Sequence, residues 1–149
     1  MKPLYVIAAL LAVTLLTSCN SDKRQIRAAA QGYLEATANY RADDAMPYAS
    51  QTTRERTLPF LRDKLIPITD SAYMASNTPA TIKINKIAIN GDTATVDYTK
   101  DTPIKILEGQ ILVVNEEGQW LVYVPLVLPE TITIDGRDGT VSMNTPVAL

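Results

Sequence analysis

The sequence predicts an α+β fold in which N-terminal helices pack on a curved antiparallel sheet. Between residues 22 and 41 the apolar side chains recur mostly at steps of three and four, which is the spacing of one helix face. Beyond Thr81 apolar and polar residues alternate, which is the period of a strand. Helices followed by a run of antiparallel strands give two layers, with the helices covering one face of the sheet.

Three helical segments are expected before the strands. The first covers residues 22–41. A short second helix is expected over residues 42–50, with Pro47 in its first turn, where a missing backbone N–H is tolerated. A third helix follows and is kinked or restarted at Pro59. Residues 66–80 contain turn formers without a clear period, so they are expected to form a connector.

The first of two expected hairpins contains a break in its apolar pattern. Ile82 and Ile84 alternate in one phase, and Ile87 and Ile89 alternate in the other. This slip predicts a β-bulge between them. The Asn-Gly pair at residues 90–91 tolerates positive φ, as a tight hairpin turn requires.

A second hairpin is expected about Gly118, with strands over residues 110–114 and 119–124. The later strand is apolar on both faces, which implies either a central strand or a curved sheet covered on each side. Residues 126–149 form an extension that could hold a third, weaker hairpin.

The composition excludes several kinds of catalytic and metal site. The chain has no histidine and one cysteine, which removes Ser-His-Asp and Cys-His catalytic groups, zinc sites of the histidine type and any intramolecular disulfide. No metal and no cofactor is therefore expected. The formal net charge of −2 gives no electrostatic reason to bind nucleic acid, so none is expected as a partner.

The N-terminus has the three-part layout of a secretory signal peptide. Lys2 precedes an uncharged run from Leu4 to Thr17, and small residues follow. A membrane-spanning helix needs about 20 apolar residues, so export and cleavage explain this run better than a permanent span. Residues 1–18 are therefore expected to be a signal peptide.

The end of this segment, Leu16, Thr17, Ser18 and Cys19, resembles the lipobox of bacterial lipoproteins: an aliphatic residue and two small residues before an obligatory cysteine. The resemblance implies cleavage between Ser18 and Cys19, a diacylglycerol on the Cys19 sulfur and acylation of the new amino group. Several acyl chains make a stable anchor. The alternative is an ordinary signal peptide with an incidental cysteine near its cleavage site.

The residues after the cysteine bear on the membrane address. Asn20 stands where an Asp favours inner-membrane retention in enterobacteria, so the lipoprotein resemblance favours the outer membrane of a bacterial envelope, with the domain facing the periplasm. Residues 19–21 would be the lipidated cysteine and a short tether. Three bases between residues 23 and 27 would then lie near the lipid headgroups, or on a solvated helix face.

Three stretches carry a resemblance at the level of the fold, "YRADDAMPYAS", "INGDTATVDYT" and "EEGQWLVYVP". From about residue 22 to 125 the chain resembles nuclear-transport-factor-2-like (cystatin-like) domains, in particular small bacterial lipoproteins that carry such a domain of unknown function. The resemblance implies a cone with a pocket between the helices and the sheet. It carries no catalytic motif.

Aromatic residues are the candidates for lining that pocket, because tyrosine offers an apolar body and a polar tip. They are Tyr33, Tyr98, Trp120 and Tyr123. The alternative is that these side chains are simple core residues.

The preferred function is a lipid-anchored cell-envelope protein with a non-catalytic binding or interaction domain over residues 22–149. Its partners would be the membrane, through the N-terminal lipid, and a small ligand or an envelope protein. One alternative is a pocket enzyme of the isomerase or lyase type, with Asp97 or Asp63 as the base and a tyrosine as donor. Another is a structural or assembly lipoprotein whose pocket is filled by side chains.

Overall fold

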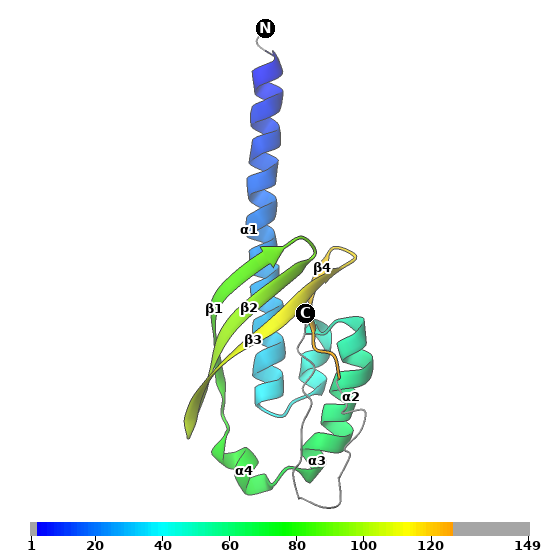
Figure 1. Cartoon of the computed structure of the whole chain (residues 1–149), viewed down its shortest axis with the longest axis vertical. Coiled ribbons are helices and arrows are strands. Elements are labelled where there is room, and N and C mark those ends of the chain that lie inside the picture. Colours follow the sequence, from blue (N-terminus) through cyan, green and yellow to red (C-terminus); the bar gives the residue numbers. More distant parts are fainter. Residues whose placement is uncertain (1–2, 127–149) are drawn as a thin grey trace, which may run out of the picture.

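The computed structural model describes residues 3–126, with side chains from Asn20 onward, and it confirms the α+β fold class (Figure 1). Seven helical segments come before four strands. Their bounds are α1 Pro3–Ala38, the 3₁₀ helix η1 Asp43–Tyr48, the π-helical turn η2 Thr53–Thr57, α2 Leu58–Phe60, the π-helical turn η3 Leu61–Leu65, α3 Ile66–Ile68, α4 Ser71–Ser76, β1 Thr81–Asn90, β2 Thr93–Thr102, β3 Lys105–Glu116 and β4 Gln119–Tyr123. The predicted hairpin after residue 126 lies outside the described residues.

Helix α1 crosses one face of the sheet and extends beyond it at its N-terminal end (Figure 1). The predicted apolar stripe is present, because Ile26, Ala30, Tyr33 and Leu34 are all buried. The helix is continuous through residues 19–21, where a lipidated cysteine and a short tether were predicted. Over the described residues, no helix is both long and apolar enough to span a membrane.

The four strands form one antiparallel sheet in the order β1-β2-β3-β4. The predicted bulge is confirmed, because the register of β1 shifts between Ile84 and Lys86. The extra residue keeps Ile87 on the same face of the sheet as Ile84. Ile84 lies opposite Tyr98, and Ile87 lies opposite Val96. All the isoleucines of β1 therefore turn toward α1, which produces the hydrophobic core on the concave side of the sheet.

Both predicted turns are confirmed, and each has a glycine with positive φ. Gly91 has a φ of 60° and is the first of the two residues between β1 and β2, where a tight hairpin favours glycine. Glu117 and Gly118 have φ values of 54° and 86°, as a type I′ turn requires of both central residues.

The outer edge of β4 is covered by the segment around η2. Ser50 N donates to Val122 O at 2.8 Å, and Thr53 Oγ1 accepts from Val124 N at 2.7 Å. Thr57 Oγ1 donates to Val124 O at 2.6 Å. The two apolar faces of β4 predicted a central strand or a curved sheet covered on each side. The central position is wrong, because β4 is an edge strand.

The opposite edge of the sheet is covered by side chains of α1. Gln31 Nε2 donates to Ile82 O at 2.8 Å, and Arg27 Nη1 donates to Ile84 O at 3.4 Å. Because these residues are four apart on α1, their side chains reach successive outward carbonyls of β1. Both edges of the sheet are therefore protected where these contacts occur.

The helical segments before the sheet differ from the prediction in two places. Residues 66–80 are not only a connector, because they contain α3 and α4, and the side chain of Asp70 caps α4 by accepting from Tyr73 N at 2.9 Å. Pro47 lies in the second turn of a 3₁₀ helix and not in the first turn of an α-helix. At Pro59 the helix restarts as predicted, since α2 begins one residue earlier and a π-helical turn precedes it.

Candidate functional site

Two of the four predicted pocket residues lie together on the concave side of the sheet. Tyr33 projects from α1 and is buried in the hydrophobic core, and Tyr98 projects from β2 and packs against that core, partly buried. The Tyr98 ring covers Gly109 of β3, where an added Cβ would lie 2.6 Å from Tyr98 Cζ. Burial, with a smaller effect of Tyr98, raises the pKa of Tyr33 to about 12, and burial also raises the pKa of Tyr98. Gly109 therefore makes room for a ring that fills the cone.

The other two predicted pocket residues are separated by the alternation of β4. Trp120 is buried in the core, and its Nε1 has no hydrogen-bond partner among the described residues. Tyr123 lies on the opposite face of the strand from Val122, which packs in the core. The four residues therefore do not line one pocket together. Tyr33 and Tyr98 form a pair, Trp120 is a separate core residue, and Tyr123 lies on the other face of the sheet.

The carboxylates considered for catalysis lie outside the cone. Asp97 faces away from α1, and its Oδ1 accepts a hydrogen bond of 2.7 Å from Gln110 Nε2. Asp63 is exposed and pairs with Arg62, whose hydrogen bond lowers the pKa of that carboxyl. No Asp or Glu of the described strands turns toward α1. The charged residues of the strands on that face are two lysines, the half-buried Lys100 and the exposed Lys105. Burial, followed by the nearby Lys105, lowers the pKa of Lys100.

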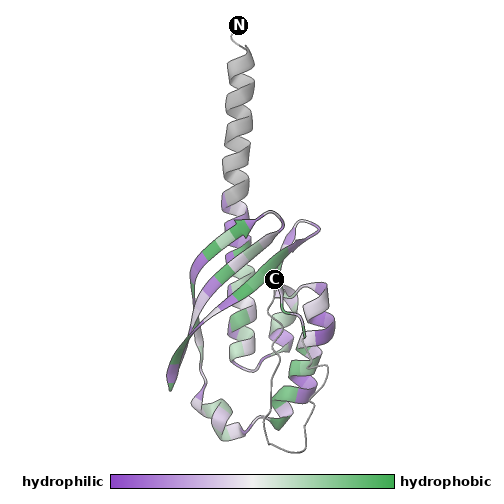
Figure 2. Cartoon of the chain, in the orientation of Figure 1, coloured by the Kyte–Doolittle hydropathy of each residue, from purple (hydrophilic) through white to green (hydrophobic). Residues whose placement is uncertain are grey.

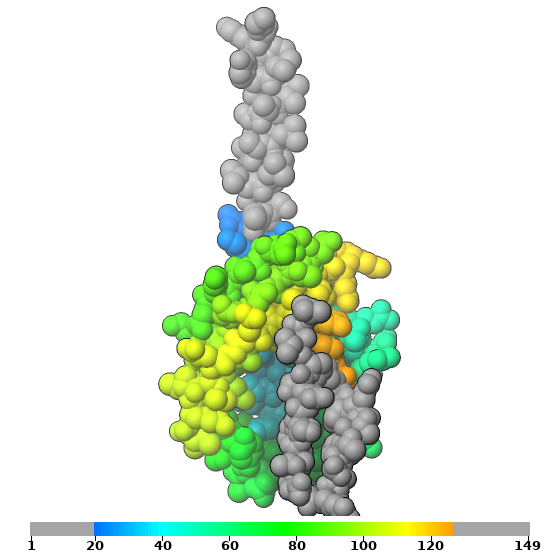
Figure 3. All heavy atoms as spheres, viewed as in Figure 1, coloured from blue at the N-terminus to red at the C-terminus, as the bar shows by residue number. Residues whose placement is uncertain are grey.

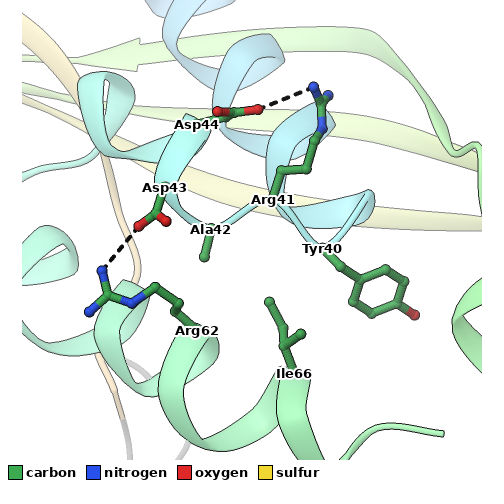
Figure 4. Close-up of a pocket in the computed structure, with 7 residues that line it drawn as sticks. All are labelled: Tyr40, Arg41, Ala42, Asp43, Asp44, Arg62 and Ile66. Atoms are coloured by element: carbon green, nitrogen blue, oxygen red, sulfur yellow. Dashed lines mark hydrogen bonds and ion pairs between the residues drawn. The ribbon is translucent and has the colours of Figure 1, made fainter. Parts of the chain in front are cut away.

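A hollow of about 320 Å³ lies outside the cone, beside the C-terminal end of α1 (Figure 4). Two ion pairs lie along it, Arg41 Nη1 with Asp44 Oδ2 at 3.2 Å and Arg62 Nη1 with Asp43 Oδ1 at 3.0 Å. Both pairs are exposed and contribute little to stability. Sequence reasoning missed this hollow because Asp43 and Arg62 are 19 positions apart and no pattern links them. Each arginine is neutralised, so the hollow offers no unpaired charge to a ligand.

Tyr40, which also lines the hollow, ends α1 in a backbone conformation that usually belongs to glycine. Its φ is 60°. Tyr40 N donates to Thr37 O at 3.1 Å and Arg41 N donates to Ala36 O at 2.9 Å, which together form a Schellman motif. A residue with a Cβ is strained in this left-handed position.

The strain at Tyr40 can be measured by comparing two variants that both remove the ring. Tyr40→Gly is expected to be about 1 kcal/mol more stable than Tyr40→Ala, because only alanine keeps the Cβ that the left-handed backbone disfavours. The measurement is the free energy of unfolding in urea. Equal stability, or the reverse order, would show that the helix ends differently in solution.

The free end of the β2–β3 hairpin carries exposed apolar side chains, here called the hairpin tip. They are Ile104, Ile106 and Leu107. Ile106 is 68% exposed. Hydrophobic residues, green in Figure 2, reach this end of the hairpin, which lies away from the N-terminal end of α1 (Figure 1). Because Ile106 and Leu107 are consecutive on a strand, the hairpin tip is apolar on both faces.

Several solved structures are similar to this chain at low sequence identity. No protein-family model matches the sequence, and no curated protein matches it either. One similar structure is a Campylobacter jejuni protein described as a candidate NTF2-like transpeptidase, with a TM-score of 0.48 and 13% identity over 62% of this chain and 92% of that one.

Two further similar structures are NTF2-like proteins of unknown function. One, from Shewanella baltica OS155, has a TM-score of 0.49 and 13% identity over 68% of this chain and 88% of that one. The other, from Shewanella oneidensis MR-1, has a TM-score of 0.47 and 15% identity over 68% of this chain and 93% of that one. These likenesses are of overall fold alone.

Proposed function

We propose that this protein is a lipid-anchored component of a bacterial cell envelope whose domain is a non-catalytic interaction module. The observation that carries the proposal is the packed concave face of the sheet. Val96, Val113 and Ile26 are fully buried there, and Tyr98 fills the space over Gly109. Such a filled interior favours contacts at the surface of the domain over binding of a small ligand inside it.

The same interior argues against the enzyme alternative. An isomerase or lyase of that type needs a desolvated carboxylate close to a proton or hydrogen-bond donor. The tyrosine pair Tyr33 and Tyr98 has no carboxylate facing it from the described strands, since Asp97 lies on the opposite face. A non-catalytic role in contacts at the surface of the domain is therefore the better account of this arrangement.

The hairpin tip is the surface that we propose for a partner protein. Its side chains are exposed, and single exposed apolar residues are common, but three near one strand end make a patch suited to a protein contact. The hairpin tip lies away from the N-terminal end of α1 (Figure 1). An anchor at Cys19 would thus direct the hairpin tip away from the membrane, toward other proteins of the periplasm.

Lipid attachment is tested by growing cells with labelled palmitate. The wild-type chain is expected to carry the label and to begin at residue 19. Cys19→Ala is expected to lose the label completely and to keep residues 1–18. Ser18→Ala is the matched control, because it keeps a small residue before the cysteine and should still be labelled. A labelled Cys19→Ala variant, or an unlabelled wild type, would overturn the anchor.

The interaction surface is tested by photo-crosslinking in whole cells. A photoreactive residue at Ile106 is expected to form one specific adduct with an envelope protein, and Leu107→Ser in the same chain is expected to weaken it. A photoreactive residue at the exposed Gln119 is the control. Equal crosslinking from both positions, or none from Ile106, would contradict this use of the hairpin tip.

A further inference from the structure

The first turns of α1 whose side chains are described carry a cluster of bases on one helix face, here called the basic stripe. It consists of Lys23, Arg24 and Arg27. Together with Asn20 these residues line a hollow of about 410 Å³. The four positions follow the spacing i, i+3, i+4 and i+7, which places them on one side of a helix. In Figure 3 the blue part of α1, which begins near residue 20, lies directly above the sheet.

The basic stripe points away from the core and is not neutralised. Its three side chains are exposed, whereas Ile26 and Ala30 on the other side of α1 are fully buried. None of the ion pairs found among the described residues involves the stripe. Arg27 does donate to Ile84 O at 3.4 Å, but a carbonyl leaves the guanidinium charge uncompensated.

The distance from Cys19 to the stripe matches the thickness of a headgroup layer. At about 1.5 Å per residue, Lys23 and Arg24 lie roughly 6–8 Å from Cys19 along the helix axis and Arg27 about 12 Å. The headgroup layer of one leaflet is about 5–8 Å thick. The screening length at physiological salt is about 8 Å. A lipid on Cys19 would therefore hold the stripe within electrostatic reach of the membrane surface.

We propose that the basic stripe binds the phosphate groups of anionic phospholipids in the leaflet that holds Cys19. The inference rests on the proposed lipid attachment. Each base near an anionic surface contributes about a fivefold factor to binding, so three bases give about a hundredfold. The acyl chains hold the protein in the membrane, and the stripe fixes α1 and the sheet against its surface. A second attachment of this kind restricts how the hairpin tip is presented.

The test uses the full chain purified from its bacterial host in two kinds of vesicle, pure phosphatidylcholine and phosphatidylcholine with 30% phosphatidylglycerol. An environment-sensitive fluorophore is attached through Ala28→Cys, an exposed position beside the stripe. The docked fraction is read from the shift in emission. We expect a blue shift in the anionic vesicles only. It should disappear at 1 M salt, where the screening length falls to about 3 Å.

Charge variants identify the residues responsible. The triple variant Lys23→Gln/Arg24→Gln/Arg27→Gln is expected to weaken docking about a hundredfold, and Lys23→Gln/Arg24→Gln, which keeps the Arg27 contact with β1, about 25-fold. The matched control removes three exposed bases elsewhere, Arg56→Gln/Lys64→Gln/Lys83→Gln. It has the same net charge as the triple variant and should dock like the wild type. Circular dichroism verifies that each variant is folded.

Flotation of the vesicles separates this inference from the proposed function. A chain that floats with neither vesicle lacks the anchor, which overturns both. A chain that floats with both vesicles but gives the same emission in each retains the anchor and overturns the headgroup site alone. Reversal of the shift by inorganic phosphate at constant ionic strength, or equal loss in the control triple variant, also overturns it, in favour of a free-anion site or a general charge effect.

Discussion

Replacing Ile26 with alanine is expected to lower the free energy of unfolding by about 2–5 kcal/mol. Ile26 is 0% exposed and is the first fully buried residue among the described side chains of α1. Its removal leaves a cavity between the helix and the sheet, and close-packed neighbours relax into such a cavity only in part. Urea denaturation followed by circular dichroism measures the change.

The chain offers a matched control for this substitution. Ile68 in α3 is 80% exposed, so Ile68→Ala removes the same atoms from a surface position and is expected to change stability by less than about 0.5 kcal/mol. If the two variants lost similar stability, the packing of α1 on the sheet would have to differ from the structure.

Stability is expected to fall by about 2–3 kcal/mol between pH 10 and pH 12 because of Tyr33. The pKa of Tyr33 is raised from 10.0 to about 12, chiefly because burial disfavours the charged phenolate. The unfolded chain therefore releases this proton first. The contribution of Tyr33 is complete below pH 10 and is lost as the pH rises through 12.

The variant Tyr33→Phe is expected to reduce this loss, because it has no proton to release at that position. Some dependence on pH should survive, since burial also raises the pKa of Tyr98. Tyr73→Phe, at a position 49% exposed, is the control for removal of an exposed hydroxyl. Urea denaturation at half-unit steps from pH 9 to pH 12 gives the comparison. A profile identical in Tyr33→Phe and wild type would contradict the burial of this hydroxyl.

The sheet could be predicted from local patterns because its determinants are short-range. The phase slip between Ile84 and Ile87 located the bulge, and the Asn-Gly pair located the first turn. The apolar face of α1 could also be predicted from the spacing of its residues, since a helix packed on one face must place its apolar residues there. These features depend on neighbours within a few positions.

The candidate site was less predictable because it depends on which distant segments meet. Tyr123 and Trp120 were both predicted to line the pocket. They are three positions apart on β4, so Tyr123 lies on the face opposite Trp120 and the core. The hollow beside Tyr40 requires Asp43 to meet Arg62, and no local pattern encodes that contact. The short helices α3 and α4 were not predicted, because their segment is rich in turn-forming residues and has no clear apolar period. One of them, α4, is capped by Asp70.

The two protected edges of the sheet have a consequence for the lipid attachment that we propose. Chains tethered in one leaflet meet at high local concentration, which favours strand-to-strand polymerisation wherever a bare edge is offered. Here Gln31 donates a hydrogen bond to an outward carbonyl of β1, and Thr53 and Thr57 form hydrogen bonds with the backbone of Val124 after β4. At these positions neighbouring copies cannot extend each other's sheets, so contacts between molecules there are left to side chains.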